Sequence, residues 1–220
     1  MFFGKENQEQ KQRKRAEKET ITSLENTFGR TFEQLRALFE GGPSQLESES
    51  FGDYPGASYQ GGLGINVWSL VFDIESHQFP RFLNLVREGS EQTDWLCFRR
   101  IENRNVSTLL ATESRFRGVA VRMLSNDAQL IRRIETSDFN PAPPWIAMYE
   151  HGPFMHLTQG AEEYWDIYIW RRFWRSRTLE QQRAFLSKAR EETIGYIADE
   201  QWADWMLEIR MSDPRTRTLD

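Results

Sequence analysis

The hydrophobic pattern at the start of the chain changes within about twenty residues. Residues 5–15 contain no apolar side chain, whereas further along apolar residues recur at three- and four-residue steps, as Ile21, Leu24, Phe28, Phe32, Leu35, Leu38 and Phe39. This spacing places them on one side of an α-helix. We therefore expect one long helix over 5–40, charged and uncovered in its first half and docked in its second. It forms a helical extension, residues 1–50.

The middle of the chain reads mainly as strands. Residues 41–64 are rich in Gly, Ser, Pro and Tyr and lack periodicity, so 51–64 are expected to be a loop or linker. Short helices are expected over 79–87 and 128–135 because their apolar residues follow helical spacing. Runs rich in β-branched and aromatic residues predict an antiparallel sheet of about four strands, over 65–74, 95–101, 106–112 and 117–124.

The last third of the chain predicts helices. A helix is expected over 160–176, and Thr178 with Gln181 forms a capping-box pattern that opens a second helix. A third helix carries an apolar stripe at Trp202, Trp205, Met206 and Ile209. The fold class is therefore α+β, in which the domain 65–220 ends in a bundle of about three helices, residues 160–211.

The run Tyr164–Trp174 is apolar around nearly its whole circumference, so most of its sides must be covered. A core closed within the chain is the favoured cover for any single ring. The chain has eight tryptophans, however, and Trp, Tyr and Arg are enriched at binding hot spots. We therefore expect a partner to bind some of the residues Trp165, Trp170, Arg171, Trp174, Arg175, Trp202 and Trp205.

Charge is segregated along the chain, although the net charge is only −5. Residues 95–134 carry eight arginines, no lysine and three acids. Guanidinium groups suit carboxylate and phosphate partners, so an anion or acidic partner is expected at Arg99, Arg100, Arg115 and Arg117. A solvated sheet face whose arginines pair with acidic loops at 47–53 and 88–94 is at least as well supported. Overall acidity makes nucleic acid the less favoured partner.

Candidate catalytic groups are few. Glu150, His151 and His156 lie close together around a Gly-Pro turn and form a weak acid–base candidate. The glycine cluster Gly61–Gly64 precedes a strand, whereas phosphate-binding glycines follow one and open a helix. No metal-ligand spacing is present either. We therefore predict no metal site and no cofactor, and favour a protein that is not an enzyme.

Cysteine content and hydropathy set the expected environment. Cys97 is the single cysteine, which fits the cytoplasm or another reducing internal compartment. No stretch of about 18 apolar residues occurs, so no membrane span is predicted.

Surplus aromatic residues, an uncovered charged helix and an unusually long loop favour one function. We expect a non-enzymatic protein that binds another protein through aromatic and arginine surfaces, as an inhibitor or immunity-type partner or as an adaptor. Two alternatives stay open: a structural or accessory subunit of a large multiprotein assembly, and a hydrolase or transferase with dispersed catalytic residues.

Overall fold

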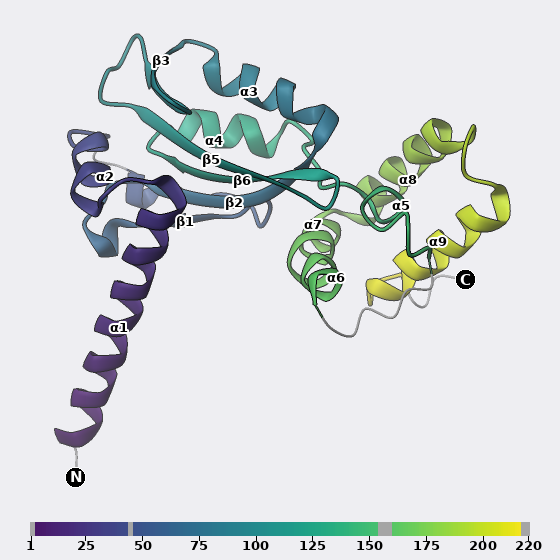
Figure 1. Ribbon diagram of the computed structural model, residues 1–220, viewed down its shortest axis with the longest axis horizontal. Coiled ribbons are helices and arrows are strands. Elements are labelled where there is room, and N and C mark those ends of the chain that lie inside the picture. Colours follow the sequence, from purple (N-terminus) through teal and green to yellow (C-terminus); the bar gives the residue numbers. More distant parts are fainter. Residues whose placement is uncertain (1–2, 44–45, 154–159, 217–220) are drawn as a thin grey trace.

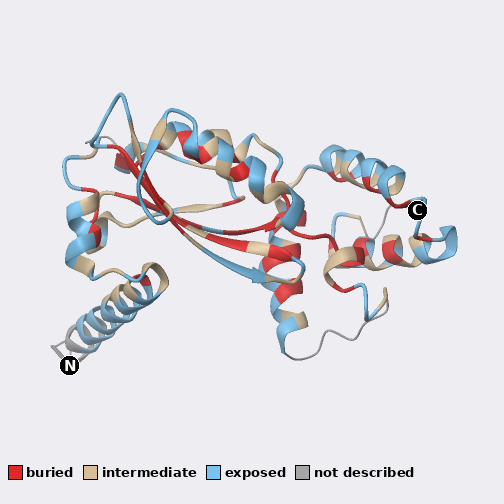
Figure 2. Cartoon of the chain, turned by 45° about the horizontal axis from the view of Figure 1, so that its top comes forward, coloured by how far each residue is buried: buried red, intermediate tan, exposed pale blue. Residues whose placement is uncertain are grey.

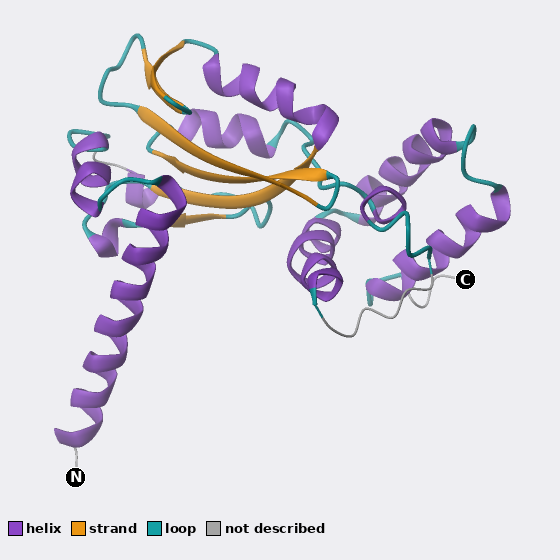
Figure 3. Ribbon diagram, viewed as in Figure 1, coloured by secondary structure: helices purple, strands orange, loops and turns teal. Residues whose placement is uncertain are grey.

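A computed structural model describes residues 3–43, 46–153 and 160–216. Within these ranges the strands form one antiparallel sheet with helices on both faces, and a group of helices lies beyond one end of it (Figure 3). The mixed α and β composition confirms the expected fold class. In order across the sheet, the strands are β1 (Ala57–Tyr59), β2 (Trp68–Glu75), β6 (Gly118–Ser125), β5 (Ser107–Arg115), β4 (Cys97–Arg100) and β3 (Ser90–Asp94).

The expectation of about four strands is wrong, because the described part of the sheet has six. Both strands that the sequence did not reveal lie at the edges. β3 is polar and largely exposed, so it lacks the apolar alternation that marks a strand packed on a core. β1 is three residues long and lies inside the range 51–64 that was expected to be a loop.

One face of the sheet is covered by α3 (Phe79–Arg87) and α4 (Ala128–Glu135), both with the expected bounds. Alternate residues of a strand point to the same face. Leu70, Phe72 and Ile74 of β2 thus meet helix residues such as Phe82 in the core, with the Phe72 and Phe82 ring centroids 5.7 Å apart. The 3₁₀ turn η3 (Ser76–Gln78) leads from β2 into α3.

The other face is covered at one end by α1 (Phe3–Phe28) and α2 (Phe32–Leu38). Leu35 and Phe39 pack there with Leu109 and Leu124 of the sheet. The expected single helix over 5–40 is therefore wrong. The chain turns at Gly29, whose φ of +61° lies in the left-handed region that favours glycine.

A capping box opens α2 directly after that turn. The Thr31 hydroxyl accepts from the Gln34 amide, and the Gln34 side chain accepts from the Thr31 amide. Two 3₁₀ turns, η1 (Leu46–Ser48) and η2 (Gly61–Leu63), follow before the chain enters β2.

The C-terminal helices form a second core beyond the end of the sheet (Figure 1). They are α5 (Pro144–Ala147), α6 (Ala161–Tyr164), the π-helical turn η4 (Trp165–Trp170), α7 (Arg171–Ser176), α8 (Leu179–Thr193) and α9 (Asp199–Ser212). The capping box at Thr178 and Gln181 is confirmed at the start of α8. Arg172 ties α7 to the sheet by donating to the carbonyls of Val71 (3.2 Å) and Pro55 (2.8 Å).

Candidate functional site

The aromatic helix that the sequence singled out is α6–η4–α7, and most of its tryptophans are enclosed by this chain. Trp165, Trp170 and Trp174 are each 2–3% exposed, as is Trp205 of α9. All four belong to the C-terminal core, which Trp145 of α5 joins. These four rings therefore offer no surface on which a partner could bind directly, because neighbouring side chains of the same chain cover them.

A π-helical turn explains how one helix stacks so many indoles. In η4 the amide of Arg171 donates to the carbonyl of Asp166, five residues back. The wider turn aligns residues five apart, so Trp165 and Trp170 stack with centroids 6.0 Å apart and planes 8° from parallel. Four residues on, Trp174 stacks on Trp170 at 5.3 Å. Three indoles therefore form one continuous stack.

The polar members of the predicted set are engaged within the chain. Arg171 pairs with the buried Asp166 at 2.5 Å, and this pair follows the same five-residue register. Burial raises the pKa of the Asp166 carboxyl, although Arg171 opposes the shift. Trp202 is half-buried beneath Arg190, whose guanidinium carbon lies 5.5 Å from the ring centroid.

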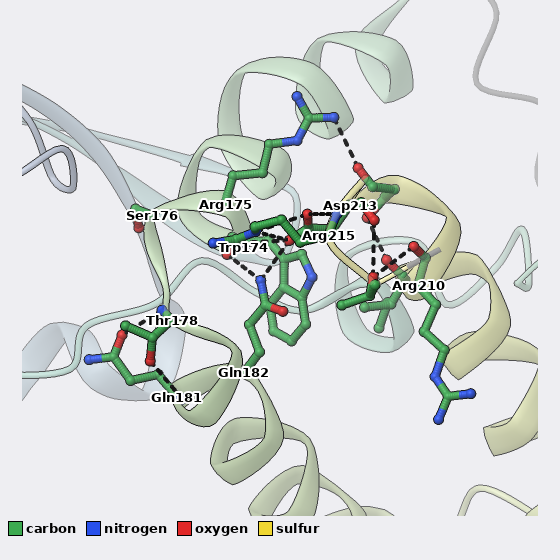
Figure 4. Close-up of polar contacts among 12 residues, drawn as sticks. Trp174, Arg175, Ser176, Thr178, Gln181, Gln182, Arg210, Asp213 and Arg215 are labelled. Atoms are coloured by element: carbon green, nitrogen blue, oxygen red, sulfur yellow. Dashed lines mark hydrogen bonds and ion pairs between the residues drawn. The ribbon is translucent and has the colours of Figure 1, made fainter. Parts of the chain in front are cut away.

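The end of α9 is fastened to the aromatic helix by a buried polar cluster (Figure 4). The Gln182 amide donates to the carbonyl of Trp174 (2.8 Å) and to the carboxylate of Asp213 (2.9 Å). Arg175 donates to the carbonyl of Ser212 at 3.0 Å. These contacts give Arg175 and Trp174 a structural role at the helix junction.

The predicted anion-binding arginines do not form one site. Arg100 pairs with Asp127 at 2.5 Å, Arg115 makes two 2.8 Å bonds to Asp73, and Arg117 reaches Glu150 at 2.8 Å. Elsewhere in the same region Arg132 and Arg133 pair with Glu49 and Glu88, in the two acidic loops. Arg99 lies on β4 opposite Ser107 and is half-buried. The structure thus uses most of these arginines to join its own elements.

The weak catalytic candidates are separated in space or lie beyond what the structure describes. Glu150 is exposed and pairs with Arg117, whereas His151 faces Glu162 at 3.9 Å. His156 lies outside the described residues. Glu150 and His151 therefore have different partners and do not form an acid–base pair with each other.

Trp95 is the tryptophan that remains exposed to solvent. It is 80% exposed, whereas six of the others are buried and Trp202 is half-buried. Trp95 lies in the turn between β3 and β4, where Leu96 has a φ of +50°. A non-glycine residue with positive φ fixes the path of a tight turn at some cost in strain. The turn therefore holds the indole away from the core.

A groove of about 540 Å³ begins beside this ring. It runs between the β3–β4 turn and the junction of α1 with α2, and includes the apolar residues Phe28, Leu96 and Leu109. An ion pair between Arg30 and Asp94 at 2.5 Å crosses its rim. The Trp95 amide and Arg30 hold the pKa of the Asp94 carboxyl below its usual range, so this rim stays charged. Trp95 and this groove together form what we call the Trp95 face.

The sequence pattern conceals this face because the apolar run over 95–101 predicts a strand that begins at Trp95. β4 begins only at Cys97, after the turn. The signal in the sequence was Asp94, whose carboxylate accepts from the Trp95 amide at 2.7 Å, a short-range bond that favours turns over strands.

Neither metal sites nor membrane spans are found in the described part of the chain. No group of three or more His, Cys, Asp or Glu residues there is placed to hold a metal ion. None of the helices within those ranges is long and apolar enough to cross a bilayer. Comparison with protein-family models, curated proteins and solved structures finds no match to this chain.

Proposed function

We propose that the protein binds another protein through the Trp95 face and does not itself catalyse a reaction. The carrying observation is that Trp95 is 80% exposed in a chain that encloses most of its other indoles. An exposed Trp gives up the hydrophobic stabilisation that its burial would provide. Where a Trp is a binding hot spot, its truncation to Ala costs roughly 2 kcal/mol or more of binding free energy.

Further support comes from the composition of the face. Phe28, Leu96 and Leu109 supply apolar positions to the groove beside the polar Asn26, Thr27, Gln34 and Thr112, and the Arg30–Asp94 pair marks its rim. A buried apolar centre with a polar rim is the usual anatomy of a protein–protein interface. The partner we propose inserts an apolar side chain into the groove and packs its surface over the Trp95 indole.

Site-specific photo-crosslinking tests the proposal in the native source. A photoreactive residue at position 95 should give a discrete protein adduct, because that side chain would lie inside the interface. The matched control is position 149, directly after α5 in the C-terminal helices, where Tyr149 is also exposed, at 60%. Equal adducts from both positions, or none from position 95, would contradict the proposal.

An inhibitor and an adaptor use such a face differently. If the partner is an enzyme whose activity falls on complex formation, the protein is an inhibitor or immunity-type partner. If the partner's activity is unchanged and a third protein joins the complex, the protein is an adaptor. Both roles predict that Trp95→Ala raises the dissociation constant of the complex by at least tenfold. Titration calorimetry with the purified partner, once crosslinking has identified it, measures this change.

A further inference from the structure

The first half of α1 extends away from the rest of the molecule. Figure 1 shows the helix leaving the sheet, and residues 10–16 are all exposed (Figure 2). Apolar packing against the body begins further along, at Leu24. The described side chains from Gln8 to Arg15 include none that is apolar, so no part of this surface is shaped to join the core.

Two of the basic side chains on this segment form ion pairs within the helix. Arg13 pairs with Glu17 at 3.1 Å, and Arg15 pairs with Glu19 at 2.9 Å. Both pairs join residues four apart, a spacing that supports an isolated helix. The helix is therefore stabilised without a covering partner.

Three lysines remain without an ion-pair partner among the described side chains: Lys11, Lys14 and Lys18. Their separations of three, four and seven residues place them on one side of the helix. They span about 10 Å along its axis, at about 1.5 Å per residue. We call this set the lysine stripe.

The lysine stripe is positive on a molecule that is otherwise negative. Residues 10–18 hold five bases and one acid, a local charge of +4 within a chain of net charge −5, so the remaining residues sum to −9. A polyanion would be repelled by the body. The polyanion would be attracted to the lysine stripe, which lies on the part of α1 before Leu24; Figure 1 shows α1 extending away from that body.

The chemistry of the stripe discriminates between kinds of polyanion. A helix that lies on a membrane needs an apolar face to insert, and one that binds a protein groove needs apolar anchors at helical spacing. Residues 8–18, which include the whole stripe, have Ala16 as their one apolar side chain and so offer neither. Exposed ion pairs with an acidic protein add little, whereas contacts to a nucleic-acid backbone gain from the release of condensed counterions.

We propose that the lysine stripe of α1 binds the phosphate backbone of double-stranded nucleic acid without reading its sequence. No residue of the Trp95 face takes part, so this binding is independent of the proposed protein partner. Contact through three lysines gives an affinity whose logarithm falls with the logarithm of salt concentration, with a slope of about −2.7.

Fluorescence anisotropy of a labelled 20-base-pair duplex, titrated with the full chain, tests this directly. Binding should be measurable at 50 mM salt and fall roughly 40-fold at 200 mM, as that slope requires. The combined change Lys11→Gln, Lys14→Gln and Lys18→Gln should weaken binding at 50 mM salt by at least tenfold. Glutamine is a good helix former, so circular dichroism should show unchanged helicity.

Two matched variants separate the stripe from overall charge. Arginine at the same three positions should keep the affinity within a few fold. The combined change Arg183→Gln, Lys188→Gln and Arg210→Gln removes as much positive charge from α8 and α9 and should leave duplex binding unaltered.

Several outcomes would overturn the proposal. They are no duplex binding at 50 mM salt, or equal binding by the glutamine variant. Displacement of the duplex by polyglutamate as readily as by unlabelled duplex would assign the stripe to acidic polypeptides. Binding to vesicles that contain anionic lipid, without binding to the duplex, would assign it to a membrane surface.

Discussion

Arg115 of β5 grips Asp73 of β2 through two parallel hydrogen bonds, each 2.8 Å long. The two strands do not neighbour each other, because β6 lies between them. The same guanidinium lies 5.3 Å from the ring centroid of Tyr164 at the end of α6. One arginine therefore joins the sheet across three strands and connects it to the C-terminal helices.

Loss of this arginine should be costly. Both partners are largely buried, with the Asp73 side chain 8% exposed, so Arg115→Ala would leave an uncompensated buried carboxylate. We expect unfolding to become easier by about 3 kcal/mol, measured by urea denaturation. Arg122→Ala is the control, since its pair with Glu113 is more exposed and should contribute less than about 1 kcal/mol. Equal effects of the two changes would mean that burial of the Asp73 pair is unimportant.

Gly118 marks a close approach between two strands. A Cβ added there would lie 2.7 Å from the carbonyl oxygen of Ile74 on β2, and the backbone would have to move. Gly118→Ala should therefore destabilise the protein by roughly 1–3 kcal/mol. A Cβ at Gly195 meets nothing within 4 Å, so Gly195→Ala should be neutral or slightly stabilising. Thermal unfolding of both variants measures the difference.

Tryptophans at the two ends of the exposure range should behave differently. Trp174→Ala empties a place in the indole stack and should cost about 3–5 kcal/mol in urea unfolding. Trp95→Ala removes an exposed ring and should change the free energy of unfolding by no more than about 0.5 kcal/mol. A large loss of stability in Trp95→Ala would show that the indole supports the fold, which would undermine its proposed role in binding.

Two carboxyls of the C-terminal core should give opposite dependences on pH. The Arg215 guanidinium, opposed by burial and aided by Gln182, holds the pKa of Asp213 well below its usual range. Its contribution is present above the unfolded-state pKa of about 4 and is lost as pH falls below that value. Asp213→Asn should therefore reduce the loss of stability between about pH 5 and pH 2.

Glu208 gives the reverse case. Burial, followed by the nearby charge of Asp166, raises the pKa of Glu208. Its contribution is complete below the unfolded-state pKa and is lost as pH rises through the folded-state value, so Glu208→Gln should stabilise the protein most at neutral pH. Urea titrations of wild type and both variants across this range provide the measurement. The prediction of opposite pH dependences is wrong if both substitutions change the slope of stability against pH in the same direction.

The sequence predicted elements well where one side of a helix packs on a core. The helices at 79–87 and 128–135 have the predicted bounds because their apolar spacing is produced by one packing surface. The sequence pattern did not predict elements whose residues are not packed against the core. β3 is polar and exposed, so it has no apolar alternation. The turn at Gly29 depends on a positive φ, which the apolar spacing from Ile21 to Phe39 does not reveal because that spacing continues on both sides of the turn.

The candidate site was harder to predict for a related reason. A count of tryptophans identifies a surplus of rings but not which ring stays exposed. The position of Trp95 depends on a turn with positive φ at Leu96, and a strand-like run of neighbours conceals that turn. The stacking of Trp165 on Trp170 was equally inaccessible, because helical pattern analysis assumes 3.6 residues per turn.

The π-helical turn sets the rotational phase of everything after it. If the same six residues wound as an ordinary α-helix, each would add about 100° of rotation instead of the smaller step of the π-helical turn, and α7 would swing by roughly 100° in total. Arg172 would then point away from the carbonyls of Pro55 and Val71, and the helical half would lose its alignment with the strands. The π-helical turn thus takes up one extra residue while leaving Arg172 directed at those carbonyls, which keeps the C-terminal helices aligned with the sheet.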